Sequence, residues 1–129
     1  MSTIVALSTP RGRGALAVVR LSGRDAIAIA QRMGLYEVEN RRATLTTLTR
    51  PRDGEKLDQV LLTCFRAPHS LTGEDVVEIS CHGSPAVVRS IIDTTLELAA
   101  VLAGPGEFTL RALSNEARVE RARHLGGSA

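Results

Sequence analysis

Aromatic residues, cysteine and net charge are all scarce in this sequence of 129 residues. It has no tryptophan, one tyrosine and two phenylalanines, so it lacks the rings on which proteins that bind single-stranded nucleic acids stack bases. Its 16 basic and 14 acidic residues leave a net charge of +2, which excludes a polybasic nucleic-acid binder. Two cysteines, Cys64 and Cys81, are too few for a secreted disulfide framework, and we therefore expect a cytoplasmic protein with reduced thiols.

The sequence also lacks the motifs of membrane proteins, zinc sites and nucleotide-hydrolysing enzymes. The apolar stretch near the N-terminus is too short for a signal peptide or a membrane span, so no membrane partner is expected. The histidines and cysteines are too scattered for a zinc site, and we expect no metal. No G-x-x-x-x-G-K-[ST] loop occurs, and the Gly-rich loop at residues 11–14 (RGRG) leads into a predicted strand. That loop is either a structural turn or a contact for an anion or a partner, and no nucleotide hydrolysis can be placed on it.

The pattern of apolar residues predicts one α+β domain. Alternating or β-branched runs predict five strands, at residues 3–8, 15–21, 43–48, 59–65 and 75–81, of which the third and fourth form a hairpin. Apolar stripes at helical spacing predict helices over residues 24–33, from Pro85 to about residue 100, and from Phe108 onward. We therefore expect a two-layer sandwich in which a mixed sheet of about five strands packs against two to three helices.

Two charged residues stand inside apolar strands, where a charge is costly unless it is solvated, paired or bound to a ligand. Arg20 continues the face of its strand that carries Leu16 and Val18, and Glu78 continues the face of Val76. The simpler interpretation is a structural ion pair or an exposed sheet face. The functional interpretation is a polar ligand held over the sheet, since a carboxylate accepts hydrogen bonds from amines and amides and a guanidinium donates to oxygens.

A cysteine and a histidine adjoin in the sequence Cys81-His82-Gly83, which raises the possibility of a nucleophile with its base. Adjacent side chains on a strand point to opposite faces, so the thiol and the imidazole are not expected to meet. We expect a core cysteine and a structural histidine. His69, in a loop, is expected to be solvated, and the charged stretch at residues 115–123 to form a solvated helix face.

Three blocks of the sequence, in this order, resemble one family. They are TIVALSTPRGRGALAVVRLSG at residues 3–23, LTGEDVVEISCHG at residues 71–83 and GPGEFTLRALSN at residues 104–115. Together they resemble the N-terminal domain of the MnmE family of tRNA-modification GTPases, also called TrmE. On this resemblance we assign residues 1–118 to the family domain and residues 119–129 to a divergent charged tail that is expected to fray.

The resemblance implies an α+β module that forms a homodimer and binds a tetrahydrofolate derivative, either 5-formyl- or 5,10-methylene-tetrahydrofolate. In the complete family protein, a helical domain and a GTPase domain follow, and the partner MnmG helps to modify the wobble uridine of tRNAs. The folate is implied to be the source of the one-carbon unit. The GTPase motifs are missing from this sequence, so we do not expect the chain alone to be an enzyme, whereas the full-length family protein is a GTP hydrolase.

Three positions carry the family's folate contacts by resemblance. Arg20 in VVRLSG and Glu78 in DVVEIS match the folate-contacting Arg and Glu of the family. The third contact in the family is a lysine; an ungapped match places Ala117 there, and a shift of one residue places Arg118 there. Arg118 supplies the positive charge, although a guanidinium differs from an ammonium in geometry.

Other interpretations stay open at this point. The chain could be a dimerisation or scaffold domain that has lost its ligand, because the lysine position and the tail diverge from the family. A free-standing aminomethyltransferase-type enzyme is disfavoured, because no general acid or base is identifiable. Both an excised N-terminal domain and a natural truncated relative fit a sequence that lacks the GTPase motifs.

Overall fold

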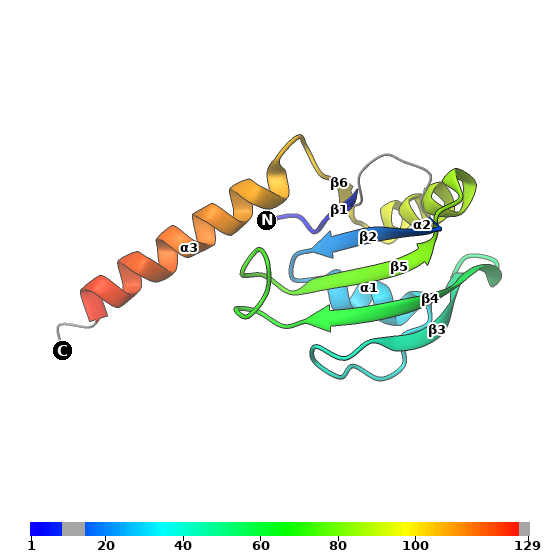
Figure 1. Cartoon of the computed structure of the whole chain (residues 1–129), viewed down its shortest axis with the longest axis horizontal. Helices are drawn as coiled ribbons and strands as arrows, with labels where there is room; N and C mark the ends of the chain where they lie inside the picture. The colour runs from blue at the N-terminus through cyan, green and yellow to red at the C-terminus, as the bar shows by residue number, and fades with distance from the viewer. Residues whose placement is uncertain (9–14, 127–129) are drawn as a thin grey trace.

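The computed structural model describes residues 1–8 and 15–126. The RGRG loop at residues 11–14 and the last three residues of the expected tail therefore lie outside the described residues. Within the described part, runs of strands are interspersed with three helices, as in an α+β fold (Figure 1).

The sheet has six strands in the order β3-β4-β5-β2-β1-β6. Neighbouring strands are antiparallel except for the parallel pair of β1 and β6, so the sheet is mixed as expected. The hairpin predicted for the third and fourth strands is confirmed, with a register shift between Leu48 and Thr49. The bounds of the strands are β1 Ile4–Leu7, β2 Leu16–Ser22, β3 Thr44–Arg50, β4 Glu55–Phe65, β5 Val76–His82 and β6 Val101–Leu102.

Two helices, α1 (Ala26–Met33) and α2 (Pro85–Glu97), pack against one face of the sheet, and Figure 1 shows α1 behind β4 and β5. The stripe expected on α1 is entirely buried, and it ends at Gly34, whose φ of 133° suits glycine. Proline at the first position of α2 costs no hydrogen bond there. The core between the helices and the sheet is built from alternate strand residues such as Val19, Leu21, Val77 and Ile79. The two-layer prediction is confirmed.

The other face of the sheet, which carries Arg20, Glu78, Leu45 and Leu61, is called the open face here. The register places these side chains on one side, because Arg20 lies opposite Glu78 and Leu45 lies opposite Leu61. Leu45 is 63% exposed and Leu61 is 46% exposed. The two candidates on the strands, Arg20 and Glu78, therefore lie on the face that α1 and α2 leave uncovered.

The prediction of about five strands differs from the structure by one short strand. Strand β6 has only two residues, both exposed, which is too short to show a periodicity in sequence. Its pairing with β1 includes hydrogen bonds from the Val101 N–H to Thr3 and from the Ala103 N–H to Val5, at 2.8 and 2.9 Å. The strand is thus defined by a partner at the other end of the chain.

The third helix, α3 (Glu107–Gly126), projects away from the sheet (Figure 1). It crosses residue 118 without a break, so residues 119–126 continue the helix, and the fraying of the tail stays a prediction. The domain boundary at residue 118 coincides with no change of secondary structure and stays a prediction. In the described part of the chain, no helix is both long enough and apolar enough to cross a membrane.

The two cysteines provide a test of the core. Both are free and buried, and burial raises the pKa of Cys64 to about 11 and also raises the pKa of Cys81. Because the thiolate is the reactive form, we expect iodoacetamide at pH 8 to label both at least ~100-fold more slowly in the folded chain than in guanidinium. Mass spectrometry of the labelled chain measures this, and labelling of the folded chain at the denatured rate would show that these strands open readily.

Candidate functional site

Arg20 and Glu78, which the sequence singled out separately, are direct neighbours across β2 and β5. Nη2 of Arg20 donates to Oε1 of Glu78 at 3.3 Å. Their side chains are 24% and 31% exposed, so the pair is reachable from solvent on the open face. The structure therefore brings together two of the three residues that the sequence nominated.

The Arg20–Glu78 pair alone does not satisfy Arg20. Its Nε atom is buried and has no hydrogen-bond partner among the described residues. Leaving a buried donor unpaired costs about 1–3 kcal/mol, which exceeds the 0–1 kcal/mol typical of a partly exposed ion pair. An unsatisfied donor beside a half-exposed carboxylate is an arrangement that a ligand oxygen would complete.

A hollow of about 530 Å³ adjoins Glu78 on the open face. This volume lies within the range of small-molecule sites, which is roughly 300–1,000 Å³. Its walls combine a carboxylate, a guanidinium, an imidazole and apolar side chains. The lining residues are Arg41, Phe65, Pro68, His69, Ser70, Leu71, Val76 and Glu78.

Arg118, the third nominated residue, lines a different hollow, of about 480 Å³. The two hollows share Pro68, Ser70 and Leu71, so the loop that contains these residues separates them. Arg118 is exposed on α3. The structure thus places it behind the loop that borders the hollow of Glu78, and it forms no hydrogen bond or ion pair with Arg20 or Glu78.

A cluster that the sequence did not reveal fixes α3 to the end of the open face. Arg111 is 4% exposed and donates to both carboxylate oxygens of Glu74, at 3.1 and 3.3 Å, and to Glu107 at 2.9 Å. Ser22 donates to Glu74 at 2.8 Å and is 2.6 Å from the hydroxyl of Thr72. The N–H of Gly104 and, next, the guanidinium of Arg111 hold the pKa of Glu107 below its ordinary value. We call these residues the α3 latch: Ser22, Thr72, Glu74, Glu107 and Arg111.

A close approach between Gly73 and Asn115 on α3 extends the contact made by the α3 latch. Gly73 has a φ of 81°, and a Cβ atom there would lie 2.8 Å from the Cβ of Asn115. Asn115 donates from its side chain to the carbonyl of Thr72. Each of the three sequence blocks contributes residues to this contact. The blocks therefore meet where α3 packs against the loop beside Glu78.

Cys81 and His82 do not form a nucleophile pair, as expected. The Cys81 thiol is fully buried, whereas the side chain of His82 is 66% exposed on the other face. Asp58 orients the histidine: its carboxylate lies 2.7 Å from Nδ1 and accepts the backbone N–H of His82 at 2.8 Å. The sequence had offered no partner for His82. Among the described residues, no three His, Cys, Asp or Glu side chains gather into a metal site.

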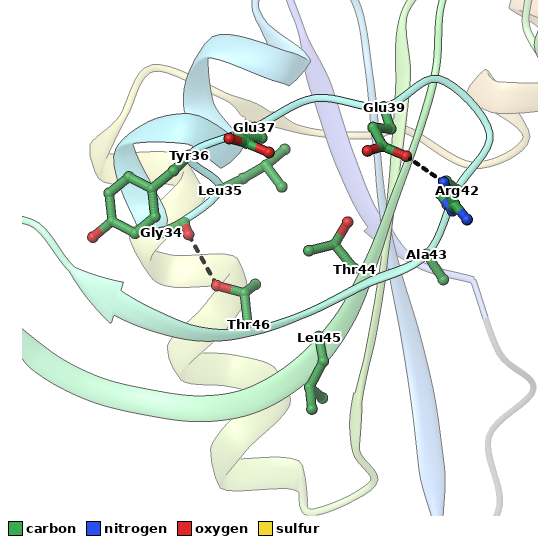
Figure 2. Close-up of a pocket in the computed structure, with 10 residues that line it drawn as sticks. All are labelled: Gly34, Leu35, Tyr36, Glu37, Glu39, Arg42, Ala43, Thr44, Leu45 and Thr46. Atoms are coloured by element: carbon green, nitrogen blue, oxygen red, sulfur yellow. Dashed lines mark hydrogen bonds and ion pairs between the residues drawn. The ribbon is translucent and has the colours of Figure 1, made fainter.

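A further hollow, of about 510 Å³, lies between the end of α1 and the edge strand β3 (Figure 2). Four of its lining residues are already paired, because Thr46 donates to the carbonyl of Gly34 and Arg42 pairs with Glu39. Tyr36 is 90% exposed at its rim. None of the residues nominated from the sequence lines this hollow, which makes it a weaker candidate than the hollow beside Glu78.

Sequence reasoning also missed Arg41, Phe65 and His69 in the hollow of Glu78. Residues 35–42 showed no periodicity, and His69 was expected only to be solvated; it is exposed, and its carbonyl accepts a hydrogen bond from Arg41. No sequence signal brings these positions together, because their proximity depends on the contact of residue 40 with β4.

Comparison with known sequences identifies relatives for nearly all of the chain. The profile of the family described as GTP-binding protein TrmE N-terminus matches residues 3–117. The chain is 46% identical over 118 residues to the tRNA modification GTPase MnmE of Koribacter versatilis, which is 88% of this chain and 26% of that relative. The MnmE proteins of Wolinella succinogenes and Thermus thermophilus are 50% and 47% identical over 88% and 87% of this chain.

These alignments cover 25% and 27% of the Wolinella and Thermus proteins. The chain therefore spans about a quarter of the length of the relatives it matches. The matched residues 3–117 contain the six strands, α1, α2, the α3 latch and the first part of α3.

Proposed function

Since the chain belongs to the TrmE N-terminal family of the tRNA modification GTPases, we propose that it is a folate-binding and homodimerisation module of a tRNA-modifying protein. Residues 1–118 would carry both properties. The proposed ligand is a tetrahydrofolate derivative, either 5-formyl- or 5,10-methylene-tetrahydrofolate. GTP hydrolysis, and work with MnmG on the wobble uridine of tRNA, belong to this proposal only through the longer family protein.

The observation that carries the folate proposal is the Arg20–Glu78 pair with its unsatisfied Nε atom. A pterin ring presents an amine and an amide N–H along one edge, and a carboxylate such as Glu78 accepts both. The pterin also carries a carbonyl oxygen, an acceptor to which the partly exposed guanidinium of Arg20 would donate. The residues present therefore fit the group, and the adjoining hollow gives room for the rest of the molecule.

The chain's own residues would bind and orient the folate. Glu78 would accept hydrogen bonds from the pterin edge, and Arg20 would donate to an oxygen. Arg118 is proposed to contribute positive charge from α3, on the far side of the loop bordering the hollow. When bound, the folate would supply the one-carbon unit, while the remaining chemistry belongs to MnmG and the tRNA.

Calorimetric titration with 5-formyl-tetrahydrofolate tests the proposal. We expect Glu78→Gln to weaken binding roughly 10- to 100-fold, because the amide removes a hydrogen bond to a charged group worth about 1.5–3 kcal/mol. Glu97→Gln is the matched control, since Glu97 is also paired with an arginine but lies at the end of α2. No binding by the unaltered dimer, or equal binding by Glu78→Gln, would refute this site.

A second candidate is a dimerisation module without a ligand. The exposed leucines of the open face favour it, because apolar side chains gathered on one uncovered face often mark a protein contact. Calorimetry together with sedimentation of the same samples separates the candidates: a dimer that binds neither folates nor tetrahydropterins supports the scaffold, whereas a dimer that binds 5-formyl-tetrahydrofolate supports the folate module.

A further inference from the structure

Arg41 is held in an unusual backbone conformation next to the hollow of Glu78. Its φ is 66°, in the left-handed region that residues with a side chain rarely adopt. Ala99 is the other such non-glycine residue in the described part of the chain, and it follows the end of α2, where this conformation is common. Arg41 ends no helix, so its conformation needs a different cause.

Neighbouring backbone contacts impose this conformation. The N–H of Arg41 donates to the carbonyl of Cys64 at 2.7 Å, and Asn40 forms a bridge with the same residue. The side chain of Asn40 accepts the N–H of Arg66 at 2.9 Å. Residues 40 and 41 are thereby fastened to the end of β4, and the side chain of Arg41 is carried toward the hollow.

The guanidinium of Arg41 lies over the ring of Phe65, 5.4 Å from its centroid, and donates to the carbonyl of His69 at 3.3 Å. No carboxylate forms an ion pair with it among residues 1–8 and 15–126. An exposed cation–ring contact contributes about 0.5–1 kcal/mol, which is less than the roughly 1–2 kcal/mol that the left-handed conformation costs. Backbone strain of this kind concentrates at functional sites. The arrangement places a guanidinium without an ion-pair partner at the wall of the hollow.

We infer that Arg41 binds the carboxylate of the glutamate tail of a folate whose pterin is held at Glu78. This inference rests on the folate proposal above and adds the recognition of the other end of the molecule. A folate has hydrogen-bond donors on its pterin, a flat apolar benzoyl ring and terminal carboxylates.

The hollow offers matching groups in the same order. Glu78 is the acceptor on β5, Phe65 is an apolar ring on the adjacent β4, and Arg41 lies over that ring. Arg41 and Phe65 are thus a tail-binding subsite that discriminates folates from simple pterins.

The test compares two ligands on the same chain, 5-formyl-tetrahydrofolate and a tetrahydropterin that lacks the benzoylglutamate tail. By calorimetry, Arg41→Gln should weaken the binding of the folate roughly 10- to 100-fold, as expected for loss of a charge-assisted hydrogen bond. The affinity for the tetrahydropterin should be unchanged. Glu78→Gln should weaken both ligands. Arg42→Gln is the matched control, because Arg42 adjoins Arg41 in sequence but pairs with Glu39 beside another hollow.

A second variant keeps the inference testable if glutamine perturbs the loop. Arg41→Gly removes the side chain, and glycine adopts a φ of 66° without strain. This variant should therefore bind the folate more weakly while its melting temperature stays unchanged or rises. A lower melting temperature with unchanged folate binding would mean that Arg41 only supports the loop, and it would overturn the inference.

The possible failures are distinguishable. If the unaltered chain binds neither ligand, the folate proposal itself fails and the tail subsite fails with it. If both ligands bind and Arg41→Gln affects neither, or affects both equally, only the tail subsite is overturned. Unchanged folate binding with weaker retention of tRNA in a gel shift would also overturn it and would assign Arg41 to a phosphate.

Discussion

Replacing Arg111 with methionine is expected to release α3 from the end of the open face. Methionine keeps an apolar stem but leaves the carboxylates of Glu74 and Glu107 facing each other without their shared cation. Removing one partner of a buried ion pair costs about 3–5 kcal/mol, because the remaining charge stays desolvated. Arg111 is 4% exposed, and its partners are 18% and 29% exposed, so we expect the lower part of that range.

Hydrogen exchange measures this release where it occurs. A loss of about 3 kcal/mol corresponds to exchange roughly 100-fold faster in the first turns of α3, while amides of β5 should keep their protection. Arg89→Met is the control, since Arg89 and its partner Asp93 are 85% and 62% exposed and should contribute little. Unchanged protection at residues 107–115 in Arg111→Met would show that α3 is held by something other than the α3 latch.

Replacing Gly23 with alanine is expected to destabilise the whole sheet. The φ of Gly23 is 142°, and an added Cβ would lie 2.6 Å from the backbone Cα of Thr3 and 2.5 Å from its hydroxyl. Thr3 is buried immediately before β1, so relief of the clash requires β1 to move. Conformational strain of about 1–2 kcal/mol and overpacking of about 1–3 kcal/mol together predict a loss of about 2–5 kcal/mol.

Urea unfolding followed by circular dichroism measures this loss, and Gly54→Ala isolates the steric part. Gly54 also has a positive φ, 72°, but a Cβ there meets no atom within 4 Å. We expect Gly54→Ala to cost only the conformational strain, about 1–2 kcal/mol. Equal losses for the two substitutions would mean that β1 yields to the added methyl group.

Periodicity accounts for most of the fold that could be predicted. The alternation of two along a strand was enough to assign Arg20 and Glu78 each to one face of its strand, and the helical spacing on α1 identified its buried stripe. These patterns are local and are therefore legible in a single sequence. That Arg20 lies opposite Glu78 additionally depends on the register of β2 and β5, which the sequence left open.

The parts that could not be predicted depend on contacts between distant segments. The α3 latch joins Ser22, Glu74 and Arg111, none of which interrupts a pattern in its own segment. The conformation of Arg41 results from hydrogen bonding to β4, and an arginine carries no sequence signal for a positive φ. Arg118 shows the same limit, because its resemblance to a family position did not reveal the loop that separates it from Glu78.

The parallel pairing of β1 with β6 has a consequence for folding during synthesis. The first strand of the sheet finds its outer neighbour only when the ribosome has made residues 101–102, long after β1 itself has emerged. Chains are made from the N-terminus, and pairings between distant segments form slowly. Until then β1 is a bare edge in the nascent chain, a site where a chaperone or a wrong strand can attach.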